Sequence, residues 1–287
     1  MTDFSEASYC RHAQSYADDL VNPERKKIAA SWFDFSTANS WRSERLYKVA
    51  ASLGGVTGEK WLTVGDGRFG LDAIRLKAHG ACEVLATDLD ESLLRKAQQD
   101  GHLEHYQVEN AEQLSFAASS FDYVVCKESY HHFPRPAIAL YEMLRVAKRG
   151  VILAEPNDRE RSPLRLLMRL LGSKAPAETY EDSGNYVYSI SEREMTKVAL
   201  GLNLPQVAFK GLNDAYVPGL EFAPLDSPAG RAMRRKIAIR DTLCAWGLDH
   251  SMLLMACLLH IPLGDEQRKK MKNDGWRVVD LPRNPYI

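Results

Sequence analysis

The chain has 287 residues, with 37 lysines and arginines against 38 aspartates and glutamates, a net charge of −1, and 45% hydrophobic residues. This composition is typical of a globular protein with a sizeable core and excludes a mainly disordered chain. The near-neutral charge provides no general field for a polyphosphate, so we expect no nucleic-acid partner.

Neither an export signal nor a membrane-spanning segment is predicted. The first ten residues, MTDFSEASYC, carry acids where a leader needs basic and then apolar residues. The strongest apolar run, Met252 to Leu263, is shorter than the ~20 residues that cross a bilayer, and we expect a core helix there. Five scattered cysteines form no CxxC pair, which favours reduced thiols, a cytoplasmic location and no metal site.

Residues 1–55 are predicted to form an N-terminal helical cap. The helical run WRSERLYKVAASL (41–53) is followed by Gly54 and Gly55, which would stop it. Trp32, Phe33 and Trp41 lie close together in this cap. They either cover a bound cation as a lid or pack the cap on the rest of the protein, and packing is the simpler interpretation.

Residues 56–160 are predicted to form the central domain. From residue 60, short apolar runs alternate with helical segments: WLTV, LDAIRLKAHG, EVLATD, ESLLRKAQQDG, HYQVEN, FDYVVC, AIALYEMLRVAKRG and VILAEP. This alternation predicts an α/β fold with a parallel sheet that has helices on both faces.

Residues 161–287 are predicted to form a third, acceptor-binding region. The pattern indicates a helix over 163–171, a helix that opens at the capping box formed by Ser191 and Glu194, and a strand near 206–210. A long, mostly helical stretch over about 226–263 then precedes the final apolar segment, WRVVDL.

A glycine turn carries the strongest functional signal. WLTV runs directly into GDGRFG (65–70), and Asp88 ends the next strand 23 positions after Gly65. In doubly wound sheets such glycines let the backbone approach a nucleotide, and an acid about 20 residues later accepts hydrogen bonds from ribose hydroxyls. Both NAD and S-adenosylmethionine meet these requirements. Asp66 favours the second, because a carboxylate inside the turn would repel a diphosphate and attract a sulfonium or ammonium group.

Several motifs in the same order resemble those of the class I S-adenosylmethionine-dependent methyltransferases, in particular the type 11 branch that acts on small molecules. These are TVGDGRFG, LATDLDESLL, VENAEQLSF, SFDYVVCKESYHHF and ALYEMLRVAKRGVILAEP, which together span about residues 60–156. The resemblance implies a Rossmann-like, doubly wound, mostly parallel sheet of seven strands whose last two strands form an antiparallel hairpin. Here helical segments would be inserted between those two strands.

The resemblance also implies the cofactor S-adenosylmethionine, with S-adenosylhomocysteine as product, and places Asn110 and Ala111 beside the adenine. Arg42 could meet the methionine carboxylate as an ion pair. The predicted cofactor-binding residues are Gly65, Asp66, Gly67, Asp88, Leu89, Asn110, Ala111, Lys127 and Arg42. Two positions depart from the family pattern: Thr63 replaces an acid at the end of the first strand, and Phe69 replaces a third glycine.

The acceptor is expected above the carboxyl ends of the strands, next to residues that follow the fourth strand. The candidate catalytic residues there are His131, His132 and Glu128. A histidine is the side chain most easily tuned to accept a proton near neutral pH, and His131 is the preferred base. Methyl transfer needs such a base only when the acceptor must lose a proton; otherwise alignment and exclusion of water suffice.

Basic residues suggest the nature of the acceptor. Arg161, Arg165 and Arg169 form a stripe on one helix, and a second cluster begins at Arg231. They are either solvated faces or contacts for a phosphorylated, sugar-linked or lipid-linked acceptor or for a membrane surface. The sequence thus favours methylation of oxygen or nitrogen on a small molecule. A nicotinamide-dependent oxidoreductase and a methyltransferase-like protein without turnover remain the alternatives.

Overall fold

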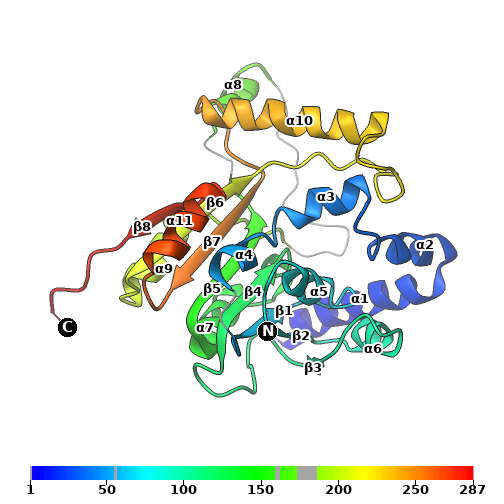
Figure 1. Ribbon diagram of the computed structural model, residues 1–287, viewed down its shortest axis with the longest axis horizontal. Coiled ribbons are helices and arrows are strands. Elements are labelled where there is room, and N and C mark those ends of the chain that lie inside the picture. The colour runs from blue at the N-terminus through cyan, green and yellow to red at the C-terminus, as the bar shows by residue number, and fades with distance from the viewer. Residues whose placement is uncertain (1, 55–56, 159–161, 173–185, 287) are drawn as a thin grey trace.

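The computed structural model describes residues 2–54, 57–158, 162–172 and 186–286. One sheet runs through this part of the chain in the order β3-β2-β1-β4-β5-β7-β6-β8 (Figure 1). Its strands are β1 (Lys60–Val64), β2 (Glu83–Asp88), β3 (Tyr106–Val108), β4 (Phe121–Lys127), β5 (Ala147–Pro156), β6 (Gln206–Leu212), β7 (Leu253–Leu259) and β8 (Arg277–Asp280). The first five strands are parallel, and β7, β6 and β8 add to them in antiparallel register. The predicted α/β fold is confirmed, but the sheet has eight strands where seven were expected.

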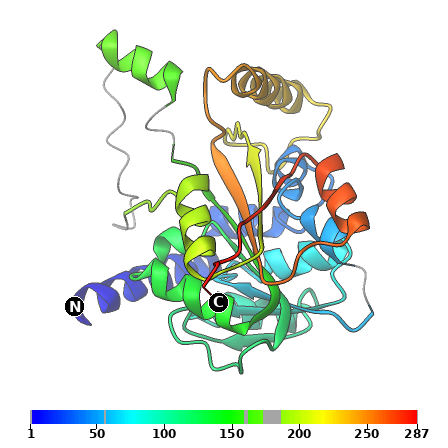
Figure 2. The same ribbon diagram turned by 90° about the vertical axis from the view of Figure 1, so that its left-hand side faces the viewer.

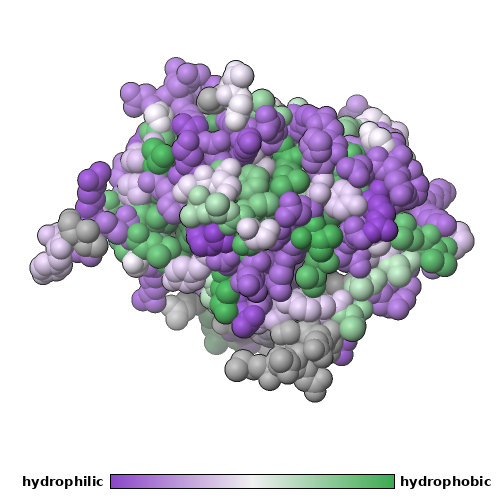
Figure 3. All heavy atoms as spheres, turned by 90° about the horizontal axis from the view of Figure 1, so that it is seen from below, coloured by the Kyte–Doolittle hydropathy of each residue, from purple (hydrophilic) through white to green (hydrophobic). Residues whose placement is uncertain are grey.

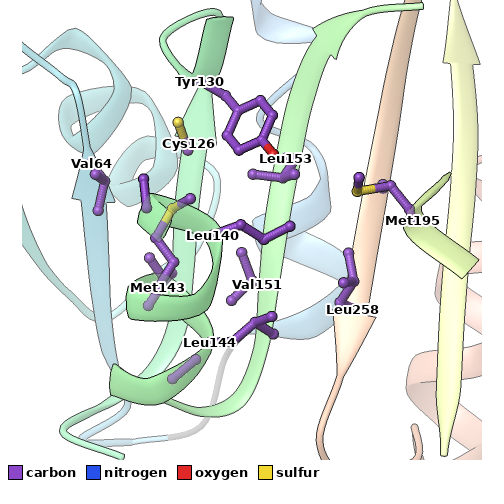
Figure 4. Close-up of a cluster of buried hydrophobic side chains, with 14 of the residues drawn as sticks. Val64, Cys126, Tyr130, Leu140, Met143, Leu144, Val151, Leu153, Met195 and Leu258 are labelled. Atoms are coloured by element: carbon purple, nitrogen blue, oxygen red, sulfur yellow. The ribbon is translucent and has the colours of Figure 1, made fainter. Parts of the chain in front are cut away.

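Helices cover both faces of the sheet, as Figures 1 and 2 show. They are α5 (Leu71–Ala78), α6 (Ser92–Gln99), α7 (Pro136–Val146), α9 (Glu192–Gly201) and α11 (Asp265–Asn273). Alternate residues of β1 separate the two faces: Leu62 belongs to the cluster of α7 and α9, and Trp61 to the cluster of α5 and α11. Figure 4 shows the first cluster, in which Leu140 and Met143 of α7 lie against Val151 and Leu153 of β5. The central strands are therefore buried on both faces.

The N-terminal cap is helical, as predicted, and consists of α1 (Thr2–Val21), α2 (Pro23–Ser31), α3 (Ala38–Glu44) and α4 (Val49–Leu53). The prediction of one helical run over 41–53 is wrong, because turns at 45–48 separate α3 from α4. Arg45 lies at this break and donates to the carbonyl oxygens of Arg42 and Asn213. A contact to a distant segment thus helps to end α3. Gly54 ends α4, and Gly55 lies outside the described residues.

The aromatic residues of the cap pack against neighbouring helices and turns. Trp32 and Phe33 make edge contacts with Phe69, with ring centroids 6.2 and 5.9 Å apart, and Phe33 stacks on His102. Trp41 packs against a separate cluster formed by α3 and α10 (Pro228–Ala245). The packing interpretation is therefore confirmed for these side chains, although Trp32 also lines the cleft described below.

Two expectations in the C-terminal part are wrong. The long helical stretch ends with α10, and the apolar run from Met252 to Leu263 contains strand β7, which lies between β5 and β6. A strand buried on both faces shows a continuous apolar run, so its pattern cannot be distinguished from that of a buried helix. Similarly, residues 147–150 were expected to end a helix, but they already belong to β5.

The expected hairpin exists with different membership. It pairs β6 with β7, and α10 is the inserted helix between them. The segment WRVVDL instead supplies β8 at the edge of the sheet, beside β6. The division of the chain into three regions at residues 55 and 160 stays a prediction. Strands from the third region join the same sheet as the strands of the central region. No helix in the described ranges has the length and apolar character needed to cross a bilayer.

Candidate functional site

The glycine turn connects β1 to α5, and Asp66 inside it caps the helix. Its carboxylate accepts the N–H groups of Asp72 (3.0 Å) and Ala73 (2.9 Å). The N–H groups of Gly70 and Leu71 donate to carbonyl oxygens of the turn itself. All four free donors of a helix N-terminus, the usual partners of a bound phosphate, are therefore satisfied within the chain.

Both departures from the family pattern have a structural explanation. The Thr63 hydroxyl donates to Asp66 Oδ2 over 2.8 Å, so a neutral donor stands where a second carboxylate would repel Asp66. Phe69 adopts φ 64°, in the left-handed region that glycine prefers. Its aromatic contacts with the cap offset this unfavourable backbone conformation.

A cavity lies beside the turn, at the carboxyl ends of β1 and β2. Most of the predicted cofactor residues line it, namely Gly65, Asp88, Leu89, Asn110 and Ala111. Asp88 Oδ1 accepts the N–H of Asp90, and burial raises the pKa of Asp88 to about 6. A buried carboxylate flanked by apolar walls suits a ribose and its base.

Tyr16 of α1 is a member of this site that the sequence analysis missed. A Cβ added at Gly67 would collide with the Tyr16 hydroxyl and would lie 2.6 Å from Asp88 Oδ2. Gly67 is therefore a position where only glycine leaves room for these two groups. Tyr16 lines both this cavity and a wider neighbouring cleft. No pattern near residue 16 indicates this role, because a packing contact 51 positions away creates it.

The wider cleft is lined by the predicted catalytic residues His131, His132 and Glu128. They lie in and before the short helix η1 (Tyr130–His132), just after β4. His131 Nδ1 lies 2.5 Å from Oε2 of Glu155, a carboxylate with no exposed surface at the end of β5. A carboxylate can only accept at this contact, which assigns the histidine proton to Nδ1 and leaves Nε2 as the basic atom.

Glu155 also holds the turn that carries His131. Its Oε1 accepts the backbone N–H groups of Ser129 (3.0 Å) and Tyr130 (2.9 Å). One buried carboxylate thus fixes the direction of η1 and the tautomer of its histidine. Glu155 belongs to the run VILAEP, and the sequence predicted no role for it.

Lys127 and Glu128 form an ion pair with each other at the same edge. Their charged atoms are 3.1 Å apart, and Lys127 also lies 3.6 Å from Asp72. The Lys127 ammonium lowers the pKa of the Glu128 carboxyl. Lys127 lines the wide cleft rather than the cavity around Asp88.

Arginines also line the wide cleft. Arg42, the predicted partner of a methionine carboxylate, pairs with Asp214 and lies over the ring of Tyr216. Arg68, in the glycine turn, is exposed and has no carboxylate partner in the part of the chain that the structure describes. Arg75 is buried, and its Nη1 atom has no hydrogen-bond partner there, although the Glu44 carboxylate is 3.7 Å away.

The fold and the site together define an α/β protein with a cavity around Asp88 and an adjoining cleft lined by arginines. Residues 62–154 match the family model described as "Methyltransferase domain". Two curated relatives are each described as a ubiquinone biosynthesis O-methyltransferase. The relative from Acinetobacter baylyi is 29% identical over 51% of this chain and 65% of its own length. The relative from Alkalilimnicola ehrlichii is 33% identical over 45% of this chain and 53% of its own length. This chain thus spans less than two thirds of either relative.

Among solved structures, a putative methyltransferase from Haloferax volcanii, in complex with the Trm112 methyltransferase activator, aligns with a TM-score of 0.52. The two chains are 15% identical, and the alignment covers 85% of this chain and 99% of the other, which shows a common fold. With the family match across β1 to β5, residues 62–154 form a methyltransferase domain of the class I S-adenosylmethionine-dependent type.

Proposed function

We propose that this protein transfers the methyl group of S-adenosylmethionine to oxygen or nitrogen on a small molecule. The choice of S-adenosylmethionine over a dinucleotide rests on the capping of α5 by Asp66. A dinucleotide needs free N–H groups at this helix end for its diphosphate, and here Asp66 satisfies them. The buried Asp88 carboxylate still offers an acceptor for ribose hydroxyls.

Different residues of the two cavities would bind different parts of the cofactor. Asp88 would bind the ribose, and Leu89, Asn110 and Ala111 would flank the adenine. Because Asp214 already neutralises Arg42, we propose the exposed Arg68 as partner of the methionine carboxylate instead. When bound, the cofactor supplies a methyl group that its sulfonium has already activated.

His131 is the proposed base for an acceptor that must lose a proton. The carboxylate of Glu155 orients the ring and would stabilise the charge that develops as Nε2 takes the proton. Glu128 is a weaker candidate, because the neighbouring ammonium lowers its pKa and hence its basicity. His132 lines both cavities, where it would help to align the acceptor.

The acceptor is proposed to carry an anionic group. The wide cleft exposes Arg68 and contains the unsatisfied Nη1 atom of Arg75, both suited to a carboxylate or a phosphate. Together they could bind one such group on the cofactor and another on the acceptor. The names of the two curated relatives favour oxygen as the atom that is methylated.

Calorimetry and a turnover assay test the proposed function in sequence. We expect adenosylhomocysteine to bind and NAD to give no heat. The reverse result would mean a nicotinamide-dependent oxidoreductase. Release of adenosylhomocysteine is then measured with a panel of phenols, amines and carboxylate-bearing or phosphorylated acceptors. Cofactor binding with no turnover on any member would favour the protein without catalytic activity.

Replacing His131 by alanine should slow turnover by about 100-fold or more at saturating cofactor, because the base is lost. The matched His132→Ala variant should lose much less. Adenosylhomocysteine affinity, measured by calorimetry, should stay the same in both variants. If neither variant is slowed to that extent, general-base catalysis by this pair is wrong.

Affinity for adenosylhomocysteine should depend on pH through Asp88, whose pKa is about 6. Ribose hydroxyls donate to the ionised carboxylate, so binding should be strongest above pH 7 and weaken as pH falls through 6 and Asp88 becomes protonated. We expect a loss of up to about tenfold between pH 7 and pH 5. Calorimetry at several pH values measures it. The Asp88→Asn variant should be weak and nearly independent of pH over this range, whereas an unchanged slope would assign the effect to another group.

A further inference from the structure

Two helices outside the methyltransferase core expose apolar side chains at one end of the molecule. α8 (Pro163–Leu170) follows the carboxyl end of β5, and α10 ends just before β7 begins. Figures 1 and 2 both show the two helices at the upper end of the molecule. The N–H of Leu164 donates to the carbonyl oxygen of Leu248, and the Ser162 hydroxyl donates to Asp249. The start of α8 is thereby attached to the loop that follows α10.

We call this exposed apolar surface the distal patch. On α8 and the residue after it, the patch consists of Leu166, Leu167, Met168, Leu170 and Leu171, which are 46% to 85% exposed. On α10 and the loop after it, the patch consists of Ile239, Trp246 and Leu248, of which Trp246 is 71% exposed. None of these side chains belongs to a core cluster of the described residues. Figure 3 shows the opposite end of the molecule, where hydrophobic residues lie in small groups among hydrophilic ones.

Cations accompany the distal patch. Arg169 is exposed on α8, and Arg235 and Lys236 are exposed on α10 within one turn of Ile239. None of the three has a carboxylate within ion-pair distance among the residues that the structure covers. One acid, Asp241, is exposed nearby and accepts a hydrogen bond from Asn213. Of the basic stripe expected on α8, Arg161 lies outside the described residues, as does the side chain of Arg165.

We propose that the distal patch docks this protein on the surface of a bilayer that contains anionic lipids. Leucines and a tryptophan beside unpaired cations are the composition of segments that lie in the interface of such bilayers. In Figure 2, α8 and α10 lie as two separate projections at the same end of the molecule. The planar surface of a bilayer can contact both helices at once, whereas a partner protein would need a surface whose shape matches both.

Docking in this way has a consequence for the wide cleft. Both helices lie beyond the carboxyl ends of the parallel strands, the same edge of the sheet at which His131 and the arginines line the cleft. The cleft would then lie on the side of the protein near the bilayer. The proposal does not depend on methyl transfer, since it rests on exposed residues outside the cofactor site.

Sedimentation of the full chain with vesicles tests the proposal. We expect binding to vesicles of phosphatidylcholine and phosphatidylglycerol, and much weaker binding to phosphatidylcholine alone. The Leu167→Glu/Leu170→Glu double variant should reduce the bound fraction by about tenfold or more. The Arg235→Gln/Lys236→Gln double variant should weaken binding by about fivefold for each cation removed. Leu200→Glu, which changes an exposed leucine on α9, is the matched control and should bind like the native chain.

A second measurement locates the contact. Vesicles with brominated acyl chains should quench part of the tryptophan fluorescence of the native chain, and the Trp246→Phe variant should lose that part. Circular dichroism and adenosylhomocysteine affinity should be unchanged in all variants, since every substituted side chain is exposed. Failure of the native chain to bind either vesicle would overturn the proposal. So would a native dimer that the leucine double variant converts to a monomer without any vesicle binding, because the distal patch would then be a contact between two copies.

Discussion

Alanine in place of Asp88 should weaken adenosylhomocysteine binding by about 10- to 150-fold, the effect of losing ~1.5 to 3 kcal/mol of hydrogen bonding to a charged acceptor. Asp88 is the only carboxylate among the predicted cofactor-binding residues that line the cavity beside the glycine turn. It lies at the end of β2, with its side chain next to Gly67. A neutral hydroxyl or amide in place of the Asp88 carboxylate would not provide a charged acceptor for both ribose hydroxyls. Isothermal titration calorimetry measures the change directly.

Glu83→Gln is the matched control for this experiment. Glu83 begins the same strand at its other end and is exposed, so its replacement should leave affinity and fold intact. Circular dichroism checks that Asp88→Ala is folded. Native-like affinity in the folded Asp88→Ala variant would mean that the ribose binds elsewhere, and with it the proposed function would lose its site.

Substitution of Glu155 by alanine should lower the free energy of unfolding by about 3 to 5 kcal/mol, because it leaves three donors, two of them buried, without an acceptor. These donors are the backbone N–H groups of Ser129 and Tyr130 and the ring of His131. Glu155→Gln should lose less, about 1 to 2 kcal/mol, since its amide oxygen can still accept the backbone groups. Urea unfolding followed by circular dichroism gives the values.

The control for Glu155 is a carboxylate on the surface. Glu266→Ala removes an exposed acid of α11 that pairs with Lys270 one turn later, and its effect should stay within about 0.5 kcal/mol. Similar stabilities for Glu155→Ala and Glu266→Ala would contradict the assignment of Glu155 as the acceptor that holds η1. A large loss in Glu155→Gln together with slow turnover would instead indicate that its charge is essential to His131.

Local patterns predicted the central part of the fold well. The strand EVLATD and the position of Asp88 at its end were predicted to the residue, because a short apolar run between turn residues defines both limits. Ser191 begins α9 and accepts the N–H of Glu194, as the capping box predicts. Each of these features depends only on residues that lie within about one helical turn or one strand of each other in the sequence.

The prediction failed for a strand that is buried on all sides, because such a strand shows no alternation of apolar and polar residues. β7 has no alternation of apolar and polar residues because β5 and β6 flank it and helices cover both of its faces. Its sequence alone was therefore consistent with a helix. The consequence was a sheet with one strand too few and a helical insertion that was too long.

By itself, the sequence determined the order of strands and helices from β1 to β5, the glycine turn and the acid that follows it, since each depends on residues close together in the chain. The tertiary structure decided which distant groups meet: Glu155 holds His131 from 24 positions away, and Tyr16 lies against Gly67 from 51 positions away. Such contacts join side chains from separate elements. Their geometry depends on how the helices pack on the sheet, and no local spacing encodes it.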